Sequence, residues 1–249
     1  MRQYLYDLAK IYNHVFVVDE LSDRRLFISN RGAGSVFPLY LYENVNLHNR
    51  KANMKTSVIQ KVGESFGREI QPEEIFFYVY AALHSVIYRR KFGEYLKIEF
   101  PRIPFTNDYG LFDKFMKLGR ELADLHLLKY EALKIPSAKL RGVGDYTVDD
   151  PIYDEKEGKL HINKKQYFEG ITKDVWEYQI GGYQVLSKWL KYRKKRKLSL
   201  ADIKHYCKVV TALKKTIEIQ EEIDELYPGV EKDIIEFKEP KENASLDEY

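Results

Sequence analysis

The sequence predicts an α+β fold with small, mainly antiparallel sheet regions and a helical part, followed by a long C-terminal helix. Short β-branched and aromatic runs occupy the start of the chain and return after residue 135. Between them, apolar residues recur at helical spacing, and a similar pattern fills the region after Ser199. We therefore divide the chain into a β-rich part (1–70), a helical part (71–135), a second β-rich part (136–182), C-terminal helices (183–227) and an acidic flexible tail (228–249).

The first part is expected to consist of strands and turns. Asn30, Gly32 and Gly34 have the residue types of a hairpin connection. Pro38 has no N–H to donate, so its strand should lie at an edge or contain a bulge. The expected strands are His14 to Asp19, Arg25 to Ser29 and Val36 to Tyr42.

The second part is expected to contain two helices, separated by the linker FPRIPF (Phe100 to Phe105). Pro72 suits a first helical position, and Glu73 and Glu74 complement the helix dipole. The apolar faces predicted for the two helices are Phe76, Val79, Tyr80, Leu83 and Ile87, then Leu111, Phe115, Leu118, Leu122 and Leu125.

The remainder returns to strands and ends in helices. A polar turn from Asp154 to Lys159, with Gly158 in it, should join two strands. Gly181 and Gly182 should form a turn that allows close backbone approach, and Ser199 should begin the long helix. The apolar positions expected in the two C-terminal helices are Val185, Leu186, Trp189 and Leu190, then Ile203, Tyr206, Val210, Leu213 and Ile217.

Composition predicts a soluble intracellular protein. The chain has 249 residues, of which 44% are hydrophobic and 32% charged. A single cysteine, Cys207, excludes a disulfide framework and a multi-cysteine zinc site. No stretch reaches the roughly 20 apolar residues of a membrane span, and the N-terminus lacks a secretory signal. We therefore expect a cytoplasmic protein that does not contact membranes.

Charge is distributed unevenly along the chain. Residues 218–249 contain twelve Asp or Glu and three Lys, so this end carries −9 and the first 217 residues carry +12 of the net +3. Seven of the ten residues from Lys188 to Lys197 are basic. An excess of positive charge in the first 217 residues is suited to binding double-stranded DNA. A solvated lysine-rich helix end would give the same pattern of charge in the sequence.

Signatures of catalysis are missing from the sequence. The eight prolines are isolated from one another, so there is no Asn- or Asp-Pro-Pro-aromatic loop of an adenine methyltransferase. The pairs Gly32/Gly34 and Gly142/Gly144 lack the third glycine of a dinucleotide-binding loop, and no Walker A sequence occurs. We expect no catalytic residues, no metal ligands and no cofactor in this chain.

Two alternatives stay open. Asp150, Asp154 and Lys156 resemble the two acids and the lysine of a small metal-dependent nuclease, although they cluster around one predicted turn. The second alternative is a protein-interaction adaptor that uses its helical faces and its acidic tail.

His84 and His126 lie within helical faces and are expected to be core or interface histidines.

Loops with Arg, Lys, Asn and Gln are the candidates for DNA contact, because these side chains bind base edges or phosphates. Asn30 and Arg31 lie in one such loop, and Lys164, Lys165 and Gln166 lie in another. The basic run supplies candidates for phosphate contact: Lys188, Lys191, Arg193, Lys194, Lys195 and Arg196.

An ordered set of segments resembles the C-terminal target-recognition (specificity) domain of type ISP restriction–modification enzymes and related adenine-specific DNA methyltransferases. The resemblance covers roughly residues 13 to 215. The segments are Val36 to Tyr42, Ile75 to Arg89, Leu96 to Phe105, Leu118 to Leu128, Ile162 to Ile171 and Val175 to Leu190.

This resemblance implies sequence-specific recognition of double-stranded DNA by a domain without catalytic activity of its own. Its sheet regions would read the DNA, and its helices would dock to an adenine-N6 methyltransferase module. Members of the family also carry an ATPase and a nuclease in the same polypeptide. The chain is therefore expected to be a fragment, a split-gene product or an expressed domain. Base-contacting positions vary with the target sequence, so none is carried over from the family.

Overall fold

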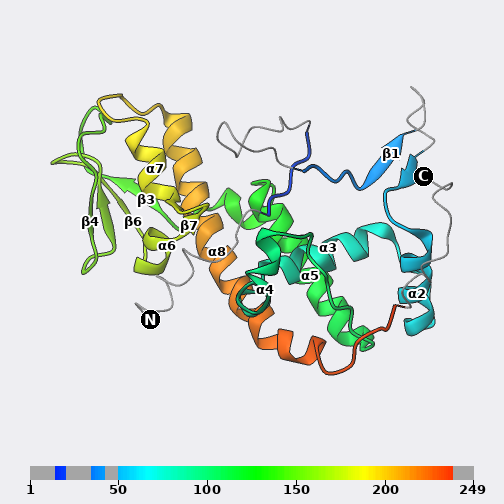
Figure 1. Ribbon diagram of the computed structural model, residues 1–249. Coiled ribbons are helices and arrows are strands. Elements are labelled where there is room, and N and C mark those ends of the chain that lie inside the picture. The colour runs from blue at the N-terminus through cyan, green and yellow to red at the C-terminus, as the bar shows by residue number, and fades with distance from the viewer. Residues whose placement is uncertain (1–14, 21–34, 43–49, 238–249) are drawn as a thin grey trace.

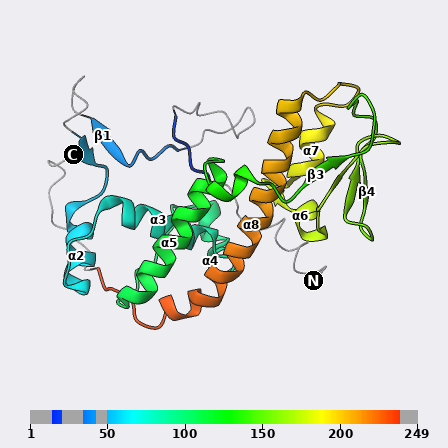
Figure 2. The same ribbon diagram turned by 180° about the vertical axis from the view of Figure 1, so that it is seen from behind.

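The computed structural model describes residues 15–20, 35–42 and 50–237, and it confirms the α+β fold. Two modules lie side by side (Figure 1). The helical module contains α2 to α5, and the sheet module contains β3 to β8 together with α6 and α7. The long helix α8 (Leu200–Val230) runs through both modules, as the view from behind also shows (Figure 2).

The N-terminal part contains less strand than expected. β1 (Tyr40–Tyr42) pairs antiparallel with β2 (Arg50–Ala52) in a two-stranded ribbon. Pro38 lies before this strand, where its carbonyl oxygen accepts a hydrogen bond from the Asn53 side chain at 3.0 Å. The described residues 15–18 belong to no strand, which corrects the first expected strand. The expected strand Arg25 to Ser29 and its turn lie outside the described residues.

Residues 56–66, which we expected to be strands and turns, form helix α2 (Thr56–Phe66). Val58, Ile59, Val62 and Phe66 have the three- and four-residue spacing of a helical face, and Val62 is fully buried. Gly67 then ends the helix with a φ of 62°, and its N–H bonds back to carbonyls of the last turn.

The helical module continues as expected, with one additional break. Ser85 lies between two helices, and its side chain caps the second by accepting a hydrogen bond from the N–H of Tyr88. After this break, the FPRIPF linker leads to the longest helix of the module. The elements are α3 (Pro72–His84), α4 (Val86–Phe92), η1 (Tyr95–Lys97), α5 (Tyr109–His126) and η2 (Glu131–Lys134).

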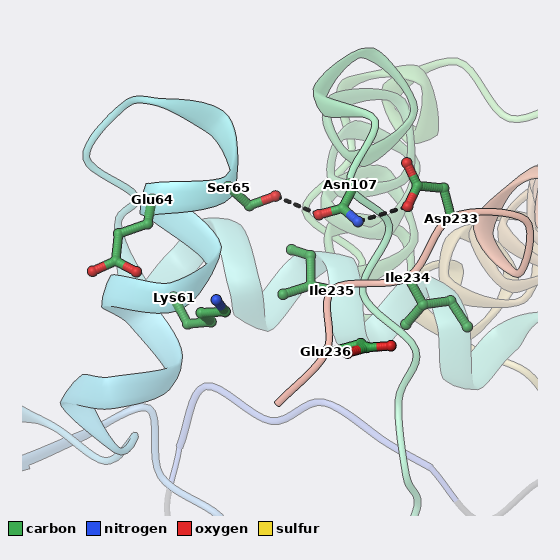
Figure 3. A pocket seen from close by; sticks show the side chains of 8 residues that line it. All are labelled: Lys61, Glu64, Ser65, Asn107, Asp233, Ile234, Ile235 and Glu236. Atoms are coloured by element: carbon green, nitrogen blue, oxygen red, sulfur yellow. Dashed lines mark hydrogen bonds between the residues drawn. The ribbon is translucent and has the colours of Figure 1, made fainter. Parts of the chain in front are cut away.

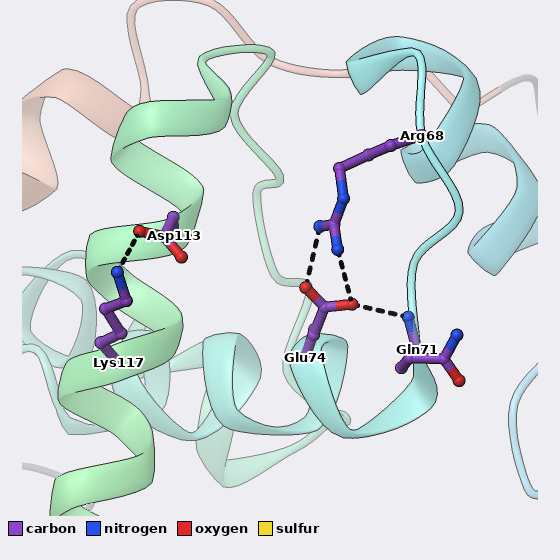
Figure 4. A network of polar contacts seen from close by, with 5 residues as sticks. All are labelled: Arg68, Gln71, Glu74, Asp113 and Lys117. Atoms are coloured by element: carbon purple, nitrogen blue, oxygen red, sulfur yellow. Dashed lines mark hydrogen bonds and ion pairs between the residues drawn. The ribbon is translucent and has the colours of Figure 1, made fainter.

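Local charge interactions fix the start of α3, as predicted from Pro72 and its acidic neighbours. The Glu74 carboxylate accepts a hydrogen bond from the backbone N–H of Gln71 at 2.8 Å, which forms a capping box. The same carboxylate forms an ion pair with Arg68 at 2.8 Å (Figure 4). On α5, Asp113 and Lys117 form an ion pair one helical turn apart (Figure 4).

Helices α3 and α5 pack against each other at the centre of this module. Phe115, Leu122 and Leu125 are fully buried, which confirms most of the face predicted for α5. The face predicted for α3 was partly wrong, because Phe76 is only half-buried and Ile87 is exposed. The break at Ser85 changes the helical phase, and α3 is covered from more than one side. Its buried residues are Ile75, Tyr78, Tyr80, Ala81, Ala82 and His84.

The sheet module is built around a four-stranded antiparallel sheet in the order β3-β6-β5-β4. Gly158, with a φ of 61°, lies in the predicted turn between β4 and β5. Leu160 and Phe168 are fully buried and pack in one core with Tyr206 and Val210 of α8. The strands are β3 (Lys139–Arg141), β4 (Ile152–Asp154), β5 (Lys159–His161) and β6 (Tyr167–Glu169).

A short hairpin leads from this sheet to the C-terminal helices. Gly181 and Gly182 form its turn with φ values of 57° and 77°. A Cβ at Gly182 would meet no atom within 4 Å, so conformation, and not the close approach we expected, explains this glycine. The elements here are α6 (Lys173–Glu177), β7 (Gln179–Ile180), β8 (Tyr183–Gln184) and α7 (Val185–Lys191).

Helix α8 begins with the predicted capping box. Ser199 and Asp202 exchange hydrogen bonds between each side chain and the other's N–H. The first half of the helix buries Tyr206 and Val210 in the core of the sheet module, and the second half buries Ile223 and other residues in the core of the helical module. No helix within the described ranges is long and apolar enough to cross a membrane.

The predicted flexible tail was wrong for residues 228–237. α8 continues through Pro228, and the following segment packs across the helical module. Ile235 is buried, and its N–H donates to the carbonyl oxygen of Phe105 at 2.7 Å. Asn107 joins this segment to α2, because its side chain bonds to both Asp233 and Ser65, beside a hollow of about 490 Å³ (Figure 3). Residues 238–249 lie outside the described part of the chain.

Candidate nucleic-acid interface

Two basic loops, distant in the sequence, meet on one segment at the end of the sheet module. This segment comprises residues 146–149. On one side, the Asn163 side chain donates to the carbonyl oxygen of Thr147 at 2.8 Å, which holds the β5–β6 turn in place. On the other side, Thr147 forms an antiparallel bridge with Lys197. The segment therefore brings the predicted loop of Lys164, Lys165 and Gln166 and the end of the basic run into one surface.

The second loop is the connection between α7 and α8, residues 192–198, which we call the strap. Its backbone is fixed by hydrogen bonds from the N–H of Lys195 to the carbonyl oxygen of Val148 at 2.7 Å, and from the N–H of Val148 to that of Arg196 at 3.0 Å. The basic run therefore lies only partly on a helix. Because the backbone is held, the exposed side chains of the strap have defined starting positions.

Several predicted cations already have partners within the protein. Lys194 forms an ion pair with Asp150. The Arg193 guanidinium lies 3.5 Å from the ring centroid of Trp189 and 3.4 Å from the Asp202 carboxylate. The Arg193 contacts hold the strap against α7 and α8, and the Lys194 ion pair joins it to Asp150, so both residues are suited to positioning the loop.

Lys188 and Lys191 lie on α7. The Lys188 ammonium lies 3.4 Å from the ring centroid of Tyr183 and 5.5 Å from that of Tyr192. Its side chain is half-buried, whereas Lys191 is exposed. Lys191 is therefore the more accessible of these two predicted phosphate ligands.

In the β5–β6 turn, Lys164 and Lys165 are exposed, whereas Gln166 is fully buried. The Gln166 amide oxygen accepts hydrogen bonds from the N–H of Tyr146 at 2.9 Å and from Asn163 at 3.2 Å. Gln166 therefore holds two loops together and cannot reach a base edge in this conformation, contrary to our expectation. Asn30 and Arg31 lie outside the described residues.

We define the basic rim as the exposed cations on both sides of segment 146–149, leaving out Lys194 because it is paired with Asp150. The β5–β6 turn contributes two of them, and the strap contributes the others. The predicted candidates included all but Lys197, which the structure adds through its bridge to Thr147. The residues of the basic rim are Lys164, Lys165, Lys195, Arg196 and Lys197.

Backbone strain is concentrated at the same place. Only three non-glycine residues in the described ranges have positive φ, and two of them, Tyr146 (65°) and Lys195 (63°), lie in the paired loops. This conformation costs a residue with a Cβ about 1 kcal/mol or more. Strained residues of this kind often occur at functional sites, which supports the rim as the site of interest.

The residues of the nuclease alternative are not brought together. Asp150 pairs with Lys194, and the Asp154 carboxylate accepts hydrogen bonds from the N–H groups of Lys156 and Glu157 in its own turn. Across the described ranges, no group of three His, Cys, Asp or Glu side chains is placed to hold a metal ion. These contacts are typical of a polar turn between two strands, which the sequence also predicted for residues 154–159.

The two helical histidines line a hollow of about 300 Å³ between the modules, which the sequence did not predict. His84 is buried and contacts Arg89 through Nδ1 at 3.0 Å. His126 contacts the Tyr80 hydroxyl at 2.6 Å and the Thr216 hydroxyl at 3.2 Å. Burial, followed by the positive charge of Arg89, lowers the pKa of both histidines. His84 therefore fits the core role that we expected, whereas His126 is an exposed residue at the hollow between the modules.

The chain is similar to three solved structures, at 21% or 22% identity, which shows a shared fold. The first is the ATP-dependent type ISP restriction–modification enzyme LlaBIII bound to DNA, with a TM-score of 0.55 over 75% of this chain and 13% of that one. The second is a nuclease-deletion mutant of the type ISP enzyme LlaGI with a DNA substrate mimic, with a TM-score of 0.51 over 74% and 14%. The third is a DrdV–DNA complex, with a TM-score of 0.57 over 76% and 21%.

The chain thus spans between 13% and 21% of the length of these larger proteins. No curated protein matches it. A family model described as "Type ISP C-terminal specificity domain" matches residues 8–222, which include both modules and the whole basic rim. Because this match covers most of the sequence, the chain belongs to the family of type ISP C-terminal specificity domains.

Proposed function

We propose that this chain binds double-stranded DNA sequence-specifically, as the target-recognition part of a restriction–modification system. The observation that carries the proposal is the basic rim, where two separate loops place exposed cations on both sides of segment 146–149. Cations at fixed positions on two loops can contact phosphates along a duplex, whereas a solvated helix end offers no such arrangement. The three similar structures are DNA complexes, which agrees with this role.

Catalysis would come from other modules of the same system, an adenine-N6 methyltransferase together with an ATPase and a nuclease. The helical module offers a surface for such a module near its proline-containing linker. Phe37 and Phe100 are about two-thirds exposed and pack edge to face at 5.4 Å. Tyr95 and Ile98 are exposed nearby in the sequence. Large exposed apolar side chains of this kind suit a protein contact better than a DNA contact.

Titration of a labelled duplex with the full chain at several salt concentrations tests the DNA-binding proposal. Binding should weaken steeply with salt, because each neutralised phosphate releases counterions. Lys165→Ala and Lys195→Ala should each weaken binding and reduce the salt slope by about one. Lys117→Ala removes the same charge from α5, away from the rim, and should leave the slope unchanged. Absence of binding at low salt, or equal effects of all three substitutions, would contradict the proposal.

A further inference from the structure

Val143 is the most exposed large hydrophobic residue in the described part of the chain, with 90% of its surface open to solvent. It lies in the sequence Gly142-Val143-Gly144-Asp145, which we call the tip loop. All four residues are exposed, and the loop connects β3 to segment 146–149. A single exposed valine needs no explanation by itself, so its setting decides whether it has a role.

The tip loop rests directly on the β5–β6 turn. A Cβ at Gly142, whose φ is 90°, would lie 1.9 Å from the carbonyl oxygen of Lys165. A Cβ at Gly144 would lie 2.5 Å from the amide oxygen of Gln166. A side chain at either position would clash with the β5–β6 turn, so both residues must be glycine. Their close contacts with the turn fix the position of the backbone of Val143, which lies between them.

Hydrogen bonds hold the far end of the loop as well. The Asp145 carboxylate accepts from the N–H of Thr147 at 3.1 Å and from its hydroxyl at 2.7 Å. The buried Gln166 side chain accepts from the N–H of Tyr146 at 2.9 Å. A loop held at both ends loses little conformational entropy on binding, so its exposed side chain is ready for contact.

The loop also lies between the two halves of the basic rim. Gly142 touches the backbone of Lys165 on one side, and Thr147, which binds the Asp145 carboxylate, forms its bridge with Lys197 on the other. If cations on both sides hold phosphates, the surface between them faces the groove of the duplex. Val143 is the exposed apolar side chain of the tip loop on that surface.

We infer that Val143 contacts the C5-methyl group of a thymine in the major groove and thereby determines base preference at one position of the target. This inference rests on the proposed DNA-binding function. In the major groove, the edges of the base pairs present hydrogen-bond donors and acceptors, and the methyl group of thymine is the apolar feature. A valine side chain cannot pair with donors or acceptors, so the methyl group is its complementary partner.

Selection of duplexes from a randomised pool by the full chain at low salt provides the test. The wild-type protein should enrich sequences with thymine at one position, and Val143→Ala should lose that preference while other positions keep theirs. Val143→Ile, which keeps an apolar branched side chain, should retain it. Ile152→Ala removes another exposed aliphatic residue of the sheet module and should change nothing.

A second measurement uses the selected duplex with that thymine replaced by uracil, which lacks only the methyl group. Wild-type affinity should fall about fourfold, as expected for one buried methyl group, and Val143→Ala affinity should not change. Unchanged base preference in Val143→Ala, or no effect of uracil on the wild type, would overturn the inference and leave the proposed function standing. A wild-type chain that binds no DNA, or binds without any preference, would instead contradict the proposed function itself.

Discussion

Gly119 of α5 lies so close to Phe77 of α3 that a Cβ at Gly119 would be 1.9 Å from the Phe77 carbonyl oxygen. The two helices can therefore approach to this distance only because residue 119 has no side chain. We expect Gly119→Ala to lower the free energy of unfolding by about 3 kcal/mol or more, because the backbones must separate. Urea denaturation followed by circular dichroism measures this change.

Gly110→Ala in the same helix is the matched control. A Cβ at Gly110 would meet one atom, the Asp108 Oδ1 at 3.2 Å, which accepts a hydrogen bond from the N–H of Leu111 and would need to shift by only a few tenths of an ångström. Alanine is the better helix former, so this variant should be as stable as the wild type or slightly more stable. Similar losses in both variants would show that helix propensity, and not the α3–α5 contact, explains the effect.

Protein stability should fall on acidification because His84 is buried without its proton. Burial, the Arg89 charge and His126 keep the His84 pKa well below 6.5 in the folded state. Below about pH 6.5 the unfolded chain binds a proton that the folded chain does not, so the free energy of unfolding decreases as pH falls. The expected loss for one such histidine approaches about 1.4 kcal/mol per pH unit until the folded-state pKa is reached.

Denaturation between pH 7.5 and 5 should therefore show a smaller slope for His84→Gln than for the wild type. His126, whose pKa is lowered to about 4, contributes in the same direction over this pH range. His205→Gln, which removes an exposed histidine of α8, serves as the control. Equal slopes in the wild type and His84→Gln would assign the acid sensitivity to other groups.

Two adjacent isoleucines test the docking of the segment after α8. Ile235 is 3% exposed and contacts the helical core, whereas Ile234 is 40% exposed. Ile235→Ala should cost about 2–4 kcal/mol through lost burial and the cavity that remains, and Ile234→Ala less than about 1 kcal/mol. Thermal denaturation of both variants checks this order. Equal, small effects would mean that the segment is not docked in solution.

Lys195 allows strain and charge to be separated. Lys195→Ala and Lys195→Gly remove the same charge, so both should weaken DNA binding equally. Only glycine relieves the positive φ of 63°, and the glycine variant should be more stable than the alanine variant by about 1 kcal/mol. Denaturation and duplex titration of the pair provide both measurements. Equal stability would indicate that the strap relaxes to another conformation.

Features of the fold that depend on neighbouring residues could be predicted from the sequence. Pro72 with the acidic residues after it, and Ser199 with Asp202, indicated helix starts from neighbouring residues alone. The structure shows the predicted capping box at Ser199 and a further one between Gln71 and Glu74. The strands were harder to place, because they are two or three residues long and depend on partners elsewhere in the chain. The run of β-branched and aromatic residues at 15–18 indicated an extended segment, but it cannot indicate whether a partner strand is present.

The candidate site could likewise be predicted only where neighbouring residues decide the structure. Composition was enough to identify the basic run and the β5–β6 turn, but not that both pack on segment 146–149. Gln166 has a suitable residue type for adenine contact, yet its burial depends on Gly144 and Tyr146, which are distant in the sequence. Two signals were available and were missed. The sequence Gly142-Val143-Gly144 places an apolar residue between two glycines, and Ile234-Ile235 interrupts an acidic run.

Helix α8 is about 46 Å long at 1.5 Å per residue, and each half completes a different hydrophobic core. The buried core of the sheet module comes from one continuous stretch, residues 138–213, whereas the helical core combines residues 62–133 with residues 212–235. Engineers who wish to transplant the proposed DNA-contacting loops into another enzyme would therefore need to move the sheet module together with the first half of α8, which completes its core.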